Sequence, residues 1–253
     1  MLLIDADPQG DLTTCLGWQD TDNLGITLAT KLTDVLNETM NDPTVGILHH
    51  DEGVDLVPAN LELSAMEFNL VNAMSRETAL RNYLSEVKDK YDYILIDCMP
   101  SLGMVTINAL SASDSVIIPV QAQYLPAKGM TQLVQTISRV KKRINPSLKI
   151  DGMLLTLVDS RTNLAKSTVE ALRENFGNQI KMYRTYTPGL DLRPLSRWMG
   201  GQGGQSLKVL GRSLSDFEVF SFSKLNNQNK FFRLKKFYLL SSSMPYFFFC
   251  RIT

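Results

Sequence analysis

The sequence has few of the residues on which metal-binding and disulfide-stabilised proteins depend. Among its 253 residues there are three cysteines and two histidines. Cys15, Cys98 and Cys250 are far apart and form no CxxC pair or Cys/His cluster, so we expect reduced thiols rather than disulfides or a zinc site. His49 and His50 are adjacent at the expected end of a strand, where a surface role is favoured over metal binding.

Long apolar segments are also missing. The aromatic stretch from Phe237 to Cys250 is interrupted by three serines and a proline, and it is shorter than the ~20 apolar residues that a membrane span needs. Met1 leads directly into an apolar strand rather than a signal peptide. We therefore expect a cytoplasmic globular protein without a membrane partner, and the chain is long enough to bury a core without disulfides.

The zero net charge hides an uneven distribution. Residues 1–188 carry 16 Lys and Arg against 23 Asp and Glu, whereas residues 189–253 carry 10 against 3. A basic tail on an acidic domain is one signature of nucleic-acid binding. A rival interpretation is that the tail is a frameshifted sequence, and we favour it because its later segments, Asn226–Phe232 and Phe247–Phe249, show no helical or strand period.

Apolar strands alternate with amphipathic helices along the first 176 residues. Strands are expected at 2–5, 46–49, 54–57, 93–97, 115–119 and 152–158, and helices at 29–38, 61–72, 76–89, 103–111, 127–143 and 164–176. The nearly continuous apolar run Val116–Val120 is typical of a strand that is covered on both faces. The pattern predicts an α/β fold with a doubly wound, mostly parallel sheet and helices on both faces, with ligands at the carboxyl ends of the strands.

Two strands deliver carboxylates to that edge of the sheet. Leu2–Gly10 reads LLIDADPQG, and Tyr93–Ser101 reads YILIDCMPS. Two such acids can hold Mg²⁺ and an attacking water beside a triphosphate. The simpler alternative for each acid is a strand-capping residue beside a turn. Prolines stiffen both turns, and the glycines that follow, Gly10 and Gly103, permit the backbone to approach a ligand.

Four blocks in this order resemble the ParA/Soj family of partition ATPases, which are deviant-Walker P-loop NTPases related to MinD. Asp5–Gly10 is similar to the family's switch I, and Ile96–Gly103 to its Walker B strand and switch II. Pro119–Tyr124 follows its strand as in the family, and Leu154–Leu164 is similar to the block that borders the base and the DNA-facing surface. The resemblance covers roughly residues 2 to 188.

The resemblance implies roles for individual residues. Asp97 corresponds to the Walker B aspartate that binds Mg²⁺ directly or through water, and Asp5 supports the same metal shell. Asp7 corresponds to the switch I aspartate that orients the water attacking the γ-phosphate. Further contacts to the nucleotide are implied for Thr156, Asp159 and Pro188, and a contact to DNA for Arg161.

The resemblance also implies a cellular role. The cofactors would be ATP and Mg²⁺. ATP would join two copies into a dimer that binds nonspecific DNA, and a ParB-type partner would stimulate hydrolysis and release. Such a protein works in the bacterial cytoplasm at the nucleoid, in chromosome or plasmid partition.

Two departures from the family change what we expect of this copy. No GxxxxGK[ST] sequence is present, so the domain 1–188 is expected to lack the family's first strand, P-loop and first helix. Loss of that strand would leave unpaired edges in the sheet. Residues 189–253 depart from the family and are expected to form an aberrant, frameshifted or disordered basic tail.

Three functions are therefore open. The chain is a partition ATPase, or a non-catalytic remnant that acts only by protein interaction, or a positioning ATPase like MinD. The third would need an amphipathic basic helix near the C-terminus, and the polar run Asn226–Asn229 interrupts any apolar stripe there. We expect the first lineage, in a truncated and inactive form.

Overall fold

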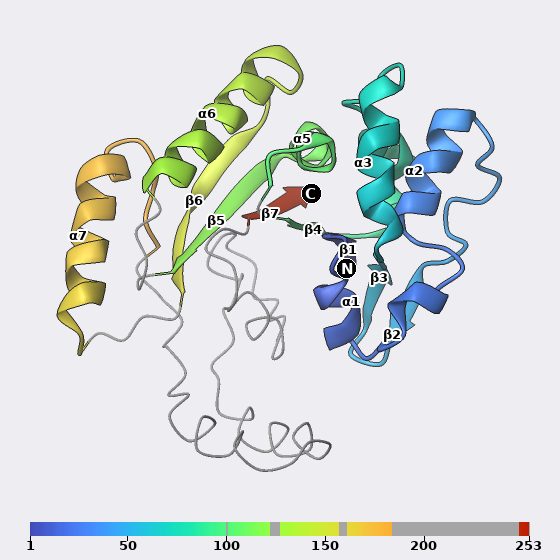
Figure 1. Cartoon of the computed structure of the whole chain (residues 1–253), viewed down its shortest axis with the longest axis horizontal. Helices are drawn as coiled ribbons and strands as arrows, with labels where there is room; N and C mark the ends of the chain where they lie inside the picture. Colours follow the sequence, from blue (N-terminus) through green and yellow to red (C-terminus); the bar gives the residue numbers. More distant parts are fainter. Residues whose placement is uncertain (100, 122–126, 157–160, 184–247, 253) are drawn as a thin grey trace, which may run out of the picture. The chain divides into compact units, whose positions relative to one another are not determined.

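The computed structural model describes residues 1–99, 101–121, 127–156, 161–183 and 248–252 (Figure 1). These residues belong to one compact unit, Met1–Gly189 together with Ser243–Thr253. The second unit, Leu190–Ser242, lies outside the described residues, and so does most of the basic tail.

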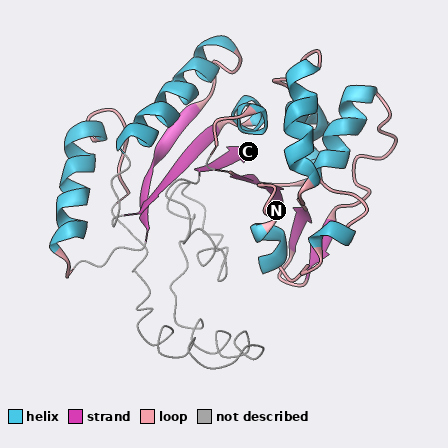
Figure 2. Ribbon diagram, viewed as in Figure 1, coloured by secondary structure: helices cyan, strands magenta, loops and turns pink. Residues whose placement is uncertain are grey.

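The compact unit is built on a seven-stranded sheet, whose strands are magenta in Figure 2, with the order β2-β3-β1-β4-β7-β5-β6. The strands are β1 Leu2–Ala6, β2 Leu48–His50, β3 Val54–Val57, β4 Ile94–Cys98, β5 Ser115–Gln121, β6 Lys149–Thr156 and β7 Phe248–Ile252. β1 pairs in parallel with β3 and β4, and β5 pairs in parallel with β6. β2 and β7 run antiparallel to their neighbours. The mostly parallel sheet predicted from the sequence is confirmed.

Helices cover both faces of the sheet, as expected for a doubly wound fold. They are α1 Asp11–Cys15, α2 Leu28–Asn37, α3 Glu62–Asn72, α4 Ala79–Val87, α5 Met104–Ala112, α6 Ala127–Arg143 and α7 Asn163–Phe176, with short 3₁₀ turns η1 Thr21–Asn23 and η2 Lys88–Lys90. Helix α6 has the predicted bounds, whereas α1 is too short to give a period and was not anticipated. Within the described ranges, no helix is long and apolar enough to cross a membrane.

The core is centred on β1, β4 and α5. Leu2, Leu3 and Ile4 have no exposed surface, because a strand inside a doubly wound sheet is covered on both faces. Helix α5 contacts β1, β4 and β7 and also the neighbouring helices α3, α4 and α6. It carries no charged residue, as expected for a helix that is buried on most sides.

The last strand corrects the expectation for the tail. Phe248–Ile252 forms β7, which lies between β4 and β5 (Figure 1). Ile94 pairs with Ile252 on one side, and Val116 pairs with Cys250 on the other. The prediction of a tail without strand structure is therefore wrong for these residues. The prediction of unpaired edges is wrong as well, because both facing edges bond to β7.

Candidate functional site

Two aspartates lie side by side at the carboxyl end of the parallel sheet. Asp5 of β1 is in register with Asp97 of β4. Neighbouring strands lie ~4.8 Å apart, and residues paired in register on parallel strands project to the same face. The structure therefore brings together the two residues that the sequence assigned to a metal.

Asp5 is fully buried and anchors the segment that follows its strand. Its Oδ2 accepts hydrogen bonds from the Thr13 N–H at 2.9 Å and the Thr13 hydroxyl at 2.7 Å. Its Oδ1 accepts one from the Asp7 N–H at 3.2 Å. Burial raises the pKa of Asp5 to about 6, although these three hydrogen bonds favour the charged form and oppose the shift.

Asp97 has a carboxylate oxygen without a partner. Its Oδ1 is buried and, among the described residues, accepts no hydrogen bond. Burial raises the pKa of Asp97 well above the usual range of a carboxyl, and the charges of Asp5, Asp7 and Asp11 raise it further. A buried acceptor without a hydrogen bond costs about 1–3 kcal/mol of stability. Binding of a proton or a cation at this oxygen would therefore be favourable.

Asp7 lies one residue beyond β1, in a tight turn. Its Oδ1 accepts a hydrogen bond from the Gln9 N–H at 2.9 Å, and its carbonyl accepts one from the Gly10 N–H at 3.0 Å. Gly10 has φ +64°, and a Cβ there would lie 3.0 Å from the Ala59 carbonyl oxygen. The turn therefore requires glycine at this position, and it holds the Asp7 carboxylate at the rim of the site.

Together the carboxylates make a site that favours cations. Burial also raises the pKa of Asp7, and the charge of Asp11 contributes to the shift. No group of three or more His, Cys, Asp or Glu in the described ranges is arranged to hold a metal on its own. Two carboxylates suit Mg²⁺, which usually keeps several waters and takes its other ligands from a bound phosphate. The orphaned oxygen of Asp97 fits that role.

The remaining predicted residues are not gathered around this pair. Thr156 is the buried last residue of β6, the third strand from β4, so it lies about 14 Å to the side of Asp97 and, in addition, four residues further along the strand direction. Arg161 is exposed and lies two residues before α7. Asp159 and Pro188 lie outside the described residues.

The histidines take part in a separate contact. His49 lies on β2, and its Nδ1 is 2.6 Å from Oδ1 of Asp55 on the neighbouring strand. The other oxygen of Asp55 accepts a hydrogen bond from the Tyr91 hydroxyl at 2.8 Å. His49 is exposed, in agreement with the surface role expected for it, whereas Asp55 is half-buried.

Two residues that hold the site together were missed in the sequence. Thr13 joins Asp5 to the chain after β3, because its hydroxyl also accepts a hydrogen bond from the Ala59 N–H at 3.1 Å. Glu67 binds the start of α5, which follows the Asp97 strand. The position of Thr13 shortly after the Asp7–Pro8 turn is a weak sequence signal for its role. No local signal in the sequence identifies Glu67.

Known proteins resemble this chain over most of its described length. A family model described as an AAA domain matches residues 1–150. The sporulation initiation inhibitor protein Soj of Bacillus subtilis is 42% identical over 188 residues, which cover 74% of this chain and 72% of Soj. The chromosome partitioning protein ParA of Myxococcus xanthus is 44% identical over 182 residues, which cover 71% of this chain and 62% of that protein.

The fold also matches a solved structure that contains a nucleotide. A protein described as cobyrinic acid a,c-diamide synthase from Mycobacterium smegmatis, with bound ADP and magnesium, superposes with a TM-score of 0.68 at 36% identity. The match covers 75% of this chain and 74% of that one.

Proposed function

Because this chain belongs to the ParA/Soj family of partition ATPases, we propose that its site serves hydrolysis of ATP to ADP and phosphate in chromosome or plasmid partition, and that the 253-residue chain, which contains no P-loop sequence, is an inactive form of such an ATPase. The observation that carries the proposal is the pair Asp5 and Asp97, in register at the carboxyl end of the sheet, with Asp5 buried and with one buried oxygen of Asp97 unpartnered among the described residues. Such an edge is where doubly wound folds bind nucleotides.

Within this proposal the three aspartates have different tasks. Asp97 and Asp5 hold Mg²⁺ directly or through water, and Mg²⁺, when bound, neutralises charge on the phosphates. Asp7, at the rim of the site, orients the attacking water. Thr156, with Asp159 and Pro188 beyond it in the chain, contributes to binding the rest of the nucleotide, which would extend along the sheet edge.

We further propose the interactions that characterise a partition ATPase. ATP joins two copies into a dimer, the dimer binds nonspecific DNA at the nucleoid, and a ParB-type partner stimulates hydrolysis. Arg161 is exposed beside the start of α7, where its guanidinium can reach a DNA phosphate. Contacts of this kind carry affinity without sequence preference.

The test compares two polypeptides. One is the 253-residue chain, in which no GxxxxGK[ST] occurs. The other, called the extended protein below, is the same chain preceded by the P-loop segment of Bacillus subtilis Soj. Isothermal titration with ATP and Mg²⁺ should give micromolar affinity for the extended protein, and binding to the 253-residue chain at least ~100-fold weaker, because the P-loop neutralises the phosphates.

Hydrolysis by the extended protein is the deciding measurement. Release of phosphate that depends on Mg²⁺ and increases with DNA and a ParB-type protein supports the proposal. If the extended protein binds ATP but does not hydrolyse it, the proposed activity is wrong. The chain would then act as a non-catalytic protein through its contacts alone.

A further inference from the structure

The first turn of helix α5 is capped by a residue from another helix. Gly103 precedes the helix and has no side chain with which to cap it. Instead, Glu67 of α3 accepts hydrogen bonds from the Met104 N–H and, at 3.0 Å, from the Val105 N–H. The first N–H groups of a helix have no partner within the helix, and a carboxylate at that end is favoured by the helix dipole.

Helix α5 begins where the loop after Asp97 ends. The chain runs from the end of β4 at Cys98 to the start of α5 at Met104 within a few residues. The first turn of α5 also holds this loop directly, because the Thr106 hydroxyl donates to the Ser101 carbonyl at 2.7 Å. A residue that fixes this turn therefore fixes the far end of the loop that follows the Asp97 strand.

Gly103 makes room for this cap. A Cβ added at Gly103 would lie 1.8 Å from Oε1 of Glu67, so the carboxylate occupies the space that any side chain would need. The backbone of Gly103 has φ −82°, which other residues adopt freely. The sequence suggested that this glycine lets the backbone approach a ligand, whereas in the structure the group that approaches it is Glu67.

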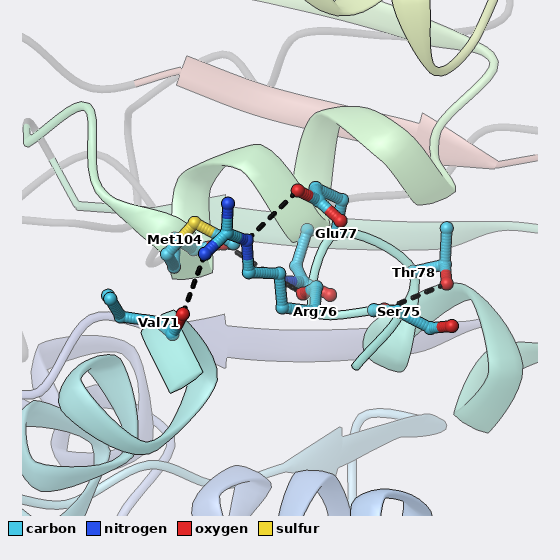
Figure 3. A network of polar contacts seen from close by, with 7 residues as sticks. Val71, Ser75, Arg76, Glu77, Thr78 and Met104 are labelled. Atoms are coloured by element: carbon cyan, nitrogen blue, oxygen red, sulfur yellow. Dashed lines mark hydrogen bonds and ion pairs between the residues drawn. The ribbon is translucent and has the colours of Figure 1, made fainter. Parts of the chain in front are cut away.

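The rest of α5 is fastened independently of Glu67. The buried Asn108 side chain accepts a hydrogen bond from the Leu80 N–H at 3.1 Å and donates one to the Arg76 carbonyl at 2.6 Å. The Arg76 side chain in turn reaches the Val71 carbonyl and Glu77 (Figure 3). Loss of the Glu67 contact should therefore release the first turn of α5 and leave the remainder in place.

We propose that Glu67 is a positioning residue, which holds the start of α5, and with it residues 101–103, after the strand that carries Asp97. The role rests on the proposed ATPase function, since its purpose is to keep the groups that follow Asp97 in place during hydrolysis. Glu67 itself does not reach the reacting atoms; it acts through the backbone of Met104 and Val105.

Amide hydrogen exchange of the 253-residue chain tests the contact without nucleotide. In Glu67→Gln the side chain keeps its size, but its NH₂ group cannot accept a hydrogen bond. The amide oxygen can still accept one of the two hydrogen bonds, so exchange at the N–H that faces the NH₂ group, that of Met104 or Val105, should become at least ~10-fold faster, while β1 and the second half of α5 keep their parental rates. Gly103→Ala, which displaces an unaltered Glu67, should give the same local change.

Glu62→Gln is the matched control, because it removes one charge from the exposed surface of the same helix α3. It should leave exchange at α5 unchanged. Parental exchange at Met104 and Val105 in both Glu67→Gln and Gly103→Ala would overturn the proposal. Faster exchange throughout the core would overturn it too, because Glu67 would then support the whole fold rather than one turn.

Steady-state kinetics of the extended protein separates positioning from simple capping. Glu67→Gln should lower kcat at least ~10-fold with little change in KM for ATP, since a misplaced loop affects the reaction more than binding. An unchanged kcat despite faster local exchange would refute the positioning role. If the unmutated extended protein hydrolyses no ATP, the proposed function fails, and exchange alone still decides whether Glu67 holds the loop.

Discussion

The buried charge of Asp5 should make the protein less stable at neutral pH than at mildly acidic pH. The pKa of Asp5 is about 6 in the folded protein against 3.8 for an ordinary aspartate. The folded state therefore keeps a proton that the unfolded chain releases between these two values. In this window stability falls as pH rises, and above pH 6 the full cost of about 3 kcal/mol is present.

Asp5→Asn removes that cost. The asparagine oxygen can still accept the two hydrogen bonds from Thr13, but its NH₂ group cannot accept from the Asp7 N–H, a loss of about 1 kcal/mol. The variant should therefore be less stable than the parent by about 0.5 kcal/mol at pH 4 and more stable by about 2 kcal/mol at pH 7. The sign of the difference should change between pH 4 and about pH 5.

Urea unfolding followed by circular dichroism from pH 4 to 8 measures this difference directly. Asp7→Asn is the control, because Asp7 is only partly buried and its replacement should produce a smaller change. An Asp5→Asn variant that is less stable than the parent at every pH would refute the reasoning. Such a result would mean that the hydrogen bonds of Asp5 outweigh the cost of burying its charge.

Three further experiments test the site, the DNA contact and the turn. In the extended protein, Asp7→Ala should bind ATP normally but lose most hydrolysis, whereas Asp97→Ala should also weaken Mg²⁺-dependent ATP binding in titration calorimetry. Hydrolysis by Asp7→Ala at the parental rate would contradict the role of Asp7 in orienting the attacking water. Arg161→Ala in the same protein should weaken binding to unrelated DNA sequences equally. The slope of log affinity against log salt concentration, measured by fluorescence anisotropy, should become shallower by about one. An unchanged slope would favour a local salt bridge for Arg161 instead. Gly10→Ala in the 253-residue chain should cost about 1–2 kcal/mol in urea unfolding, more than Gly53→Ala, which has a similar positive φ but open space around it; equal costs would show that only backbone strain matters.

The regular elements could be read from the sequence because their signals are local. The strand run before Asp97 and the amphipathic period of residues 127–143 each fix one element from its own residues, and the structure has both. The carboxyl ends of parallel strands share an edge, so the meeting of Asp5 with Asp97 followed from the fold.

The missed features depend on tertiary contacts. Residues 248–252 contain strand-favouring Phe and Ile, but so short a segment has no clear period, and it becomes a strand where it pairs with the edges of β4 and β5. Glu67 looks like an ordinary helix residue, and only packing of α3 on α5 places its carboxylate on the Met104 N–H. Sequence patterns report periodicity along one segment, but not which distant backbone groups that segment will meet.

The position of β7 also determines the order in which the sheet can be completed. Its partners in β4 come roughly 150 positions earlier in the chain, so this ladder is among the most non-local contacts of the fold. A nascent chain that has emerged only as far as α7 contains β3-β1-β4 and β5-β6, joined through α5, but lacks the strand between them. Until that strand arrives, two apolar edges are open in the middle of the protein. We therefore expect the unfinished chain to bind chaperones and to aggregate more readily than the completed one.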